Sequence, residues 1–146
     1  NIEKIYILCI GKASTDMAKS VKEILKKLKK KIVKGVIVVN EENFANVTGF
    51  TSFISGHPIP NKEGKKAADF VINYLKGTTS NDLILIFISG GGSALFNSPI
   101  KEITLKDKIK FAKNQCFTRC LSFKWGDPPQ SYAAKSSPRP VIHRRT

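Results

Sequence analysis

The sequence predicts an α/β domain of three layers, in which helices cover a mostly parallel β-sheet. Three observations lead to this fold class. Short apolar runs of strand length alternate with longer segments whose apolar residues recur at helical spacing. The expected order is strand, helix, strand, strand, helix, strand, helix, which is typical of β-α-β units. The run at residues 83–88 is apolar throughout, which favours a strand covered on both faces.

The periodicity places each element along the chain. Apolar runs predict strands at residues 4–10, 34–39, 51–55 and 82–89. Helical spacing predicts helices at residues 15–30, 62–76 and 104–112. The first helix is expected to bury Ala18, Val21, Leu25 and Leu28, with Ile24 beside them. The second is expected to bury Ala67, Ala68, Val71, Ile72 and Leu75.

Capping residues indicate where the helices begin. Ser14 or Thr15 is the expected N-cap of the first helix, and Asn61 is that of the second. Thr104 and Asp107 have the spacing of a capping box at the start of the third.

The formal net charge is +14, which raises the question of nucleic-acid binding. Much of the lysine excess before residue 113 lies in KKLKKKIVK, residues 26–34, without interleaved aromatic side chains for base stacking. We interpret it as a solvated lysine face and expect no nucleic-acid partner. No run of 18 apolar residues predicts a membrane span, and the N-terminal segment lacks a signal-peptide layout. A cytoplasmic location is therefore expected.

The cysteines, Cys9, Cys116 and Cys120, form no CxxC pair and predict neither a disulfide framework nor a zinc site. Cys9 lies within a strand pattern and is expected to be a buried apolar residue. No cluster of His, Cys and acidic residues in the sequence predicts a bound transition metal.

A change in composition divides the chain into residues 1–113, a partial domain, and an atypical tail, residues 114–146. All four arginines follow position 118, as do the tryptophan and four of the seven prolines. We expect the tail to be disordered or not native to the preceding fold, as a shifted reading frame or an alternative splice end would produce. A genuine Pro-rich tail is the alternative. Because the chain starts with Asn1 rather than Met, we expect a fragment or a processed chain.

Three glycines stand between two serines where an apolar strand ends: Ser89, Gly90, Gly91, Gly92 and Ser93. A backbone without Cβ atoms can direct its N–H groups towards an anion such as a phosphate or carboxylate. The alternative is a tight strand–helix turn that needs glycine for packing alone. Neither a GxGxxG fingerprint nor a Walker A motif is present: Leu95 stands where the first needs its last glycine, and Ala13 where the second needs Ser or Thr.

Two further residues are candidates for the same site. Lys12 follows the first strand and precedes a helix, where its ammonium group could reach the anion. An ordinary surface lysine is the alternative. His57 lies in SGHPIPN, where Pro58 and Pro60 stiffen the loop and could aim the imidazole at a site. A structural hydrogen-bonding role is the alternative.

Three motifs together resemble the N-terminal domain of glycerate 2-kinases, the family whose second half is a MOFRL-type domain. They are GKAS…MA at residues 11–18, SGHPIPNKEG at 55–64 and DLILIFISGGGSALF…P at 82–99. The resemblance spans residues 2–112 and implies a Rossmann-like domain, incomplete here, whose active-site cleft needs a missing second domain. It also implies transfer of the ATP γ-phosphate to D-glycerate, giving 2-phosphoglycerate, with Mg²⁺.

The resemblance assigns roles to the candidates. Lys12 would be the active-site lysine, residues 89–93 would line the anion-binding loop, and His57 would belong to a substrate loop. After residue 112 the family pattern is lost, because NQCFTRCLSFKWGDPP replaces the expected arginine-containing segment. We therefore expect this chain to be inactive by itself. Alternatives are a hydroxypyruvate reductase-type oxidoreductase, a label that some family members carry, and a non-catalytic degenerate fragment. The missing GxGxxG argues against the oxidoreductase.

Overall fold

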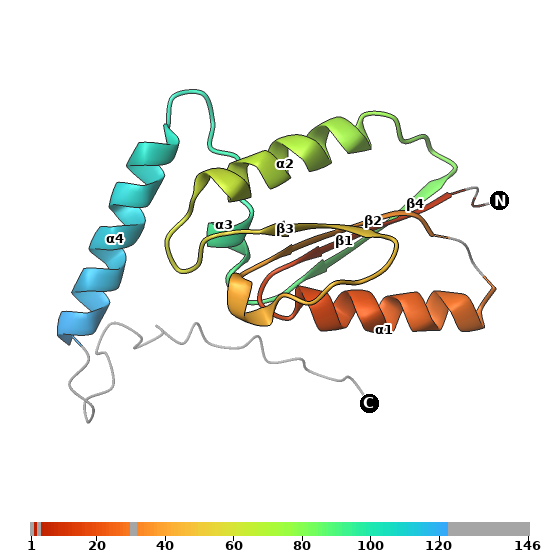
Figure 1. The fold of residues 1–146 in the computed structure, drawn as a ribbon. Coiled ribbons are helices and arrows are strands. Elements are labelled where there is room, and N and C mark those ends of the chain that lie inside the picture. The colour runs from red at the N-terminus through yellow and green to blue at the C-terminus, as the bar shows by residue number, and fades with distance from the viewer. Residues whose placement is uncertain (1, 3, 30–31, 123–146) are drawn as a thin grey trace, which may run out of the picture.

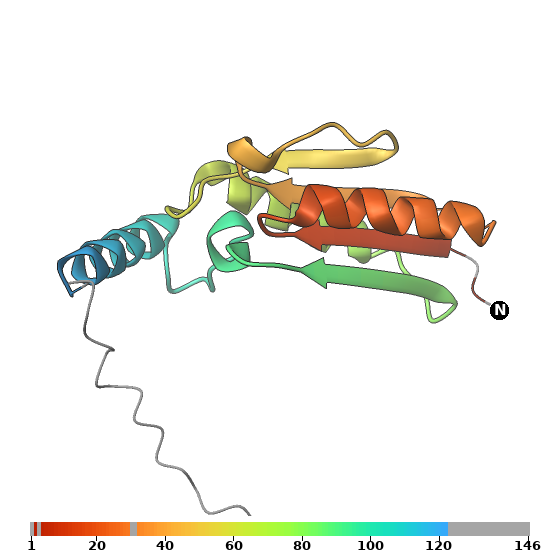
Figure 2. The same cartoon turned by 90° about the horizontal axis from the view of Figure 1, so that it is seen from below.

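Four parallel strands (Figure 1) form one sheet in the order β3-β2-β1-β4, and the view of Figure 2 separates them. The computed structural model describes residues 2, 4–29 and 32–122. The strands are β1 (Lys4–Ile10), β2 (Ile32–Val39), β3 (Phe50–Ile54) and β4 (Asp82–Ile88). The helices are α1 (Ser14–Lys27), α2 (Lys62–Leu75), α3 (Gly92–Leu95) and α4 (Leu105–Ser122), with a 3-10 turn, η1 (Glu41–Asn43), after β2. The predicted α/β fold with a mostly parallel sheet is confirmed.

Helices lie on both faces of the sheet and complete three layers (Figures 1 and 2). α1 connects β1 to β2 on one face, and α2 connects β3 to β4 on the other. Because side chains alternate along a strand, β1 contributes to both layers of the core. Ile7 and Cys9 pack in the cluster on the α1 side, and Leu8 and Ile10 pack in the cluster on the α2 side.

Cys9 is fully buried in the middle of this core and forms no disulfide. Burial disfavours the thiolate and raises the pKa of Cys9 to about 12. The thiol therefore stays protonated at neutral pH, and the prediction of a buried apolar cysteine is confirmed.

The strand β4 departs from the prediction that both of its faces are covered. Within residues 2, 4–29 and 32–122 it pairs with β1 along one edge only, and Ile86 and Ile88 are 54% and 70% exposed. Both belong to the α2 side, since they pair in register with Leu8 and Ile10. α2 packs over β2 and β3, and Ile86 and Ile88 on the α2 face of β4 remain largely exposed. The prediction of two covered faces is wrong for this reason.

Capping is confirmed for two helices and differs in the third. Asn61 Oδ1 accepts a hydrogen bond of 3.1 Å from the Gly64 N–H at the start of α2. The capping box before α4 is present, because Asp107 accepts from the Thr104 N–H at 2.9 Å and its own N–H donates back at 3.2 Å. The N-cap of α1 is Ala13. Neither Ser14 nor Thr15 caps this helix, because their hydroxyls donate to other segments of the chain.

The helix α4 lies beyond the carboxyl ends of the strands and extends to Ser122 (Figures 1 and 2). It therefore passes residue 112, where the predicted helix ends, and residue 114, where the atypical tail was expected to begin. Residues 123–146 of that predicted tail lie outside the described residues. Across the segments that the structure describes, no helix combines the length and the hydrophobicity needed to cross a bilayer.

We expect Ile7→Ala to lower the free energy of unfolding by about 2–5 kcal/mol, because it opens a cavity in the central strand where Ile7 is 0% exposed. Ile24→Ala is the matched control, since Ile24 is 55% exposed on α1, and its cost should stay below about 1 kcal/mol. Chemical denaturation followed by circular dichroism measures both. Equal losses for the two variants would contradict the burial described here.

Candidate functional site

The turns after β1 and β4 meet at the carboxyl ends of these two neighbouring strands. The Lys12 N–H donates to the Gly90 carbonyl at 2.9 Å, and the Ala13 N–H donates to Ser89 Oγ at 3.0 Å. The Ser89 N–H donates in turn to the Ile10 carbonyl at 2.8 Å. The two turns that the sequence singled out are therefore joined by direct hydrogen bonds, and one of the two serines takes part in joining them.

Gly11 makes this close approach possible. Its φ angle is +121°, and a Cβ atom at this position would stand only 2.7 Å from the Ser89 carbonyl oxygen. Any larger residue would therefore force the two turns apart. The Gly11 N–H also donates to the Val38 carbonyl at 3.0 Å, which ties the first turn to β2.

The glycine loop, residues 89–93, presents unpaired backbone donors. Gly91 has a φ angle of +88°, and its carbonyl accepts from the N–H groups of Ala94 and Leu95, both at 3.1 Å. The N–H groups of Gly90, Gly91, Gly92 and Ser93 have no hydrogen-bond partner among the described residues. α3 has four residues, so it adds only the amides of its first turn. The loop can therefore donate hydrogen bonds to a ligand with several acceptor oxygens.

The imidazole of His57 lies against this loop. A Cβ atom on Gly91 would stand 2.8 Å from His57 Cδ2, so the ring occupies the space beside that glycine. Burial lowers the pKa of His57, and the positive charge of Lys12 lowers it further, whereas the Glu42 carboxylate acts in the opposite direction. These effects together favour the neutral form of the imidazole. The structure thus brings His57, Lys12 and the glycine loop together at one place.

A buried polar cluster, which the sequence did not indicate, supports the histidine loop (residues 55–61). Ser55 Oγ donates to Asn61 Oδ1 at 3.1 Å. Asn97, which is 0% exposed, donates through Nδ2 to the carbonyls of Ala94 at 3.2 Å and Asn61 at 3.4 Å. Its own N–H donates to the Gly64 carbonyl at 3.4 Å. These bonds join the histidine loop, the start of α2 and the segment that follows the glycine loop.

A polar pocket of about 300 Å³ adjoins the histidine loop at the carboxyl ends of β2 and β3. We call it the β2–β3 pocket; it is lined by Asn40, Glu41, Glu42, Ser55, Gly56 and His57. The first three residues follow β2 directly. Their position at the carboxyl end of a parallel strand could have marked them as site residues. Only the turns after β1 and β4 were singled out from the sequence.

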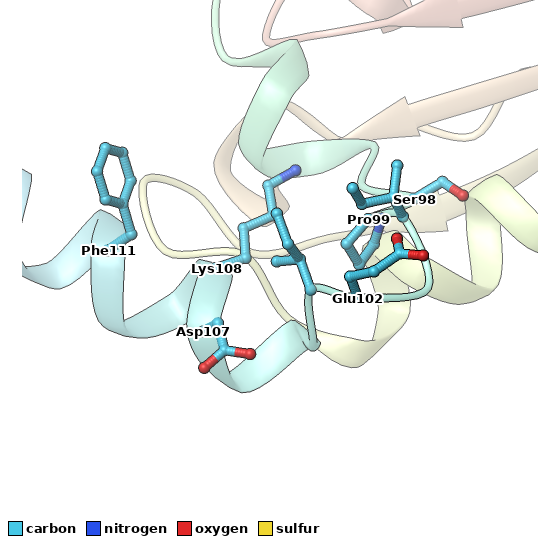
Figure 3. Close-up of a pocket in the computed structure, with 8 residues that line it drawn as sticks. Ser98, Pro99, Glu102, Asp107, Lys108 and Phe111 are labelled. Atoms are coloured by element: carbon cyan, nitrogen blue, oxygen red, sulfur yellow. The ribbon is translucent and has the colours of Figure 1, made fainter.

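A larger cavity of about 720 Å³ lies between residues 98–103 and α4 (Figure 3). Ile100, Ile103 and Phe111 line much of it, and burial there lowers the pKa of Lys108. Its size would favour this cavity as a binding site. It contains none of the unpaired backbone donors described above, however, and none of the predicted site residues. We therefore take the glycine loop and its surroundings as the candidate site. Within residues 2, 4–29 and 32–122, no group of three His, Cys, Asp or Glu side chains could hold a metal ion.

Comparisons with known proteins match most of the chain. The family model described as "Domain of unknown function (DUF4147)" matches residues 1–116. The D-glycerate 2-kinase of Thermotoga maritima is 32% identical over 108 residues, which are 73% of this chain and 25% of that protein. The glycerate 2-kinase of Pyrococcus horikoshii is 34% identical over 104 residues, or 71% of this chain and 22% of that protein.

A crystal structure of a glycerate kinase from Thermotoga maritima resembles the fold with a TM-score of 0.65 and 31% sequence identity. The likeness covers 83% of this chain and 27% of that one. The chain therefore spans about a quarter of the length of the curated relatives it matches.

We expect the His57 imidazole to titrate below the ordinary histidine pKa of about 6.5. Lys12→Met should raise this pKa because it removes a nearby positive charge, and Glu42→Gln should lower it because it removes the opposing negative charge. NMR titration of the imidazole signals measures all three values, in a His143→Gln background that leaves a single histidine. A pKa that stays the same in both variants would show that neither charge is close to the ring.

Proposed function

This chain belongs to the DUF4147 family, and on that premise we propose that it forms part of a kinase that transfers the ATP γ-phosphate to D-glycerate, giving 2-phosphoglycerate. The observation that carries the proposal is the set of unpaired N–H groups in the glycine loop, with Lys12 and His57 beside them. Because ATP is the phosphate donor, the proposal agrees with the cytoplasmic location expected from the sequence.

Phosphoryl transfer requires that the phosphate groups be held in place and that their negative charge be neutralised. In the proposed site, the N–H groups of Gly90, Gly91, Gly92 and Ser93 donate to phosphate oxygens. The Lys12 ammonium group supplies a mobile positive charge next to them. Ser89 serves in a different way, because its hydroxyl accepts from the Ala13 N–H and keeps the lysine turn against the glycine loop.

His57 is proposed to contact the hydroxy acid. A neutral imidazole can accept a hydrogen bond from a substrate hydroxyl, which a protonated one cannot. The low pKa of His57, caused by burial and by Lys12, keeps this capacity at neutral pH. The contacts of Asn61 and Asn97 hold the histidine loop where the ring meets Gly91.

In the described residues, no group of three His, Cys, Asp or Glu side chains marks a site for the Mg²⁺ ion that the resemblance implies. Mg²⁺ prefers oxygen ligands, among them one or two carboxylates beside the substrate phosphates. No hydrogen bond joins an acidic side chain of the described residues to the glycine loop, and no three-residue cluster is present in them. We therefore assign no step of the transfer to the ion.

The kinase activity is tested with a chimera, because the chain spans about a quarter of its relatives. Residues 1–116 replace the matching segment of the Thermotoga maritima relative, and ADP release is followed with ATP, Mg²⁺ and D-glycerate. We expect turnover in the chimera and none in the 146-residue chain alone. In the chimera, Lys12→Met should lower turnover by about 100-fold or more, since it removes a charge that stabilises the transition state.

Lys27→Met is the matched control for this substitution, because Lys27 is an exposed lysine in the last turn of α1, and its turnover should be unchanged. Unchanged turnover in Lys12→Met would return Lys12 to the class of ordinary surface lysines. Oxidation of NADH by hydroxypyruvate, without ADP release, would replace the kinase by the oxidoreductase alternative.

Two glycines with similar φ angles allow the function of the glycine loop to be tested apart from backbone strain. Gly91 and Gly49 have φ angles of +88° and +90°. A Cβ on Gly91 would stand 2.8 Å from His57 Cδ2, whereas a Cβ on Gly49 would meet nothing within 4 Å. Both alanine variants should therefore carry a similar strain of about 1–2 kcal/mol. We expect Gly91→Ala to weaken tripolyphosphate binding to the chain about tenfold or more, measured by calorimetric titration. Equal affinities for both variants would argue against anion binding at the glycine loop.

A further inference from the structure

The β2–β3 pocket has no role in the proposed transfer so far, although it shares a wall with the glycine loop. His57 lines the pocket, and the same ring lies against Gly91. The charges of Lys12 and Glu42 shift the pKa of this imidazole in opposite directions, because Lys12 lowers it and Glu42 raises it. Both charges therefore act at the ring. A single ligand could therefore rest an anionic group on the glycine loop and extend past His57 into the pocket.

The pocket offers hydrogen-bond acceptors rather than positive charge. Glu41 and Glu42 line it, and a carboxylate at neutral pH can only accept hydrogen bonds. Two carboxylates disfavour a second phosphate or carboxylate group in this space, because like charges repel. Such a wall accommodates hydrogen-bond donors, and in the substrates of the proposed function the hydroxyl groups are donors of this kind.

The position of Glu42 is set by a buried neighbour. Asn40 is buried at the end of β2, and its Nδ2 donates to Glu42 Oε2 at 3.2 Å. Asn40 Oδ1 accepts from Asn43 Nδ2 at 2.9 Å, so the asparagine itself is held on both sides. No hydrogen bond occupies Glu42 Oε1 in the described part of the chain. This oxygen is thus free to accept from a ligand, while its partner oxygen anchors the side chain.

The order of the strands supports the same assignment. The turn after β1 carries Lys12, and β2 lies directly beside β1 in the parallel sheet. The glycine loop follows β4 on the other side of β1, so the three turns leave neighbouring parallel strands at the same edge of the sheet. Glu41 and Glu42 stand directly after β2, at this edge.

We propose that the β2–β3 pocket binds a pair of vicinal hydroxyl groups on a ligand whose anionic group rests on the glycine loop, with Glu42 as the main acceptor. This inference rests on the proposed function, whose two substrates both offer such a pair. In ATP the pair belongs to the ribose, and in D-glycerate it consists of the hydroxyls on the second and third carbons.

The first experiment titrates the 146-residue chain with ATP, with 2′,3′-dideoxy-ATP and with tripolyphosphate. If the ribose occupies the pocket, Glu42→Gln should weaken ATP binding roughly tenfold, the size expected for a hydrogen bond to a charged group. The same substitution should leave the affinities for dideoxy-ATP and tripolyphosphate within about twofold of the parent values, because neither probe carries the hydroxyl pair.

The second experiment compares D-glycerate with D-lactate, which lacks one of the two hydroxyls. If the hydroxy acid occupies the pocket, Glu42→Gln should weaken D-glycerate binding roughly tenfold and spare D-lactate. Glu23→Gln is the matched control, since it removes the same charge from an exposed position on α1. Thermal unfolding of each variant verifies that the fold is retained.

Three results would overturn the subsite, and they separate it from the proposed function. If tripolyphosphate binds but Glu42→Gln changes the binding of neither ATP nor D-glycerate, the hydroxyl subsite is wrong. Anion binding at the glycine loop then stands. If Glu42→Gln weakens the binding of probes with and without the hydroxyl pair equally, Glu42 acts only through its charge. The hydroxyl subsite is then wrong, and anion binding at the glycine loop stands. If tripolyphosphate does not bind to the parent chain, the proposal that the glycine loop binds anions is wrong. The hydroxyl subsite, which depends on it, is then wrong as well.

Discussion

The contact between the turns after β1 and β4 is the constraint on which the candidate site depends. These strands pair in parallel up to Ile10 and Ile88, so both turns leave the sheet at the same level. Gly11 lets them touch, because a side chain there would collide with Ser89. The hydrogen bonds of Lys12 and Ala13 to the glycine loop follow from this approach. Without it, the lysine turn and the unpaired amides would be two separate surface features.

A second constraint holds the histidine loop in place through buried polar groups. Ser55, Asn61 and Asn97 bond to one another or to backbone carbonyls across a sequence separation of 36 residues. An unpaired buried polar group costs about 1–3 kcal/mol, so the hydrogen bonds of Ser55 Oγ and Asn97 Nδ2 favour this arrangement. Asn97 Oδ1 has no hydrogen-bond partner in the described residues. The position of His57 against Gly91 is a consequence of this cluster rather than of the prolines alone, because the cluster connects the loop to the segment beyond α3.

The strand β4 links the site to the edge of the described sheet. It is an edge strand with exposed Ile86 and Ile88, and an exposed apolar edge can template further strand pairing. The glycine loop begins at the residue after β4. Its position therefore depends on a single ladder, the one to β1, within the described residues.

The sequence by itself determined the local features: the four strands, the α1 and α2 helices, the Asn61 cap and the capping box before α4. Each of these depends on residues within a few positions of one another, where periodicity and side-chain chemistry act directly. The glycine loop could also be predicted from the sequence, because its three glycines and two serines are consecutive. Tertiary structure decided which segments meet. Ser89 accepts from Ala13 across 76 residues, and Ser14 donates to Val38 instead of capping its helix. The β2–β3 pocket and the exposed face of β4 likewise depend on strand order, which local sequence patterns do not encode.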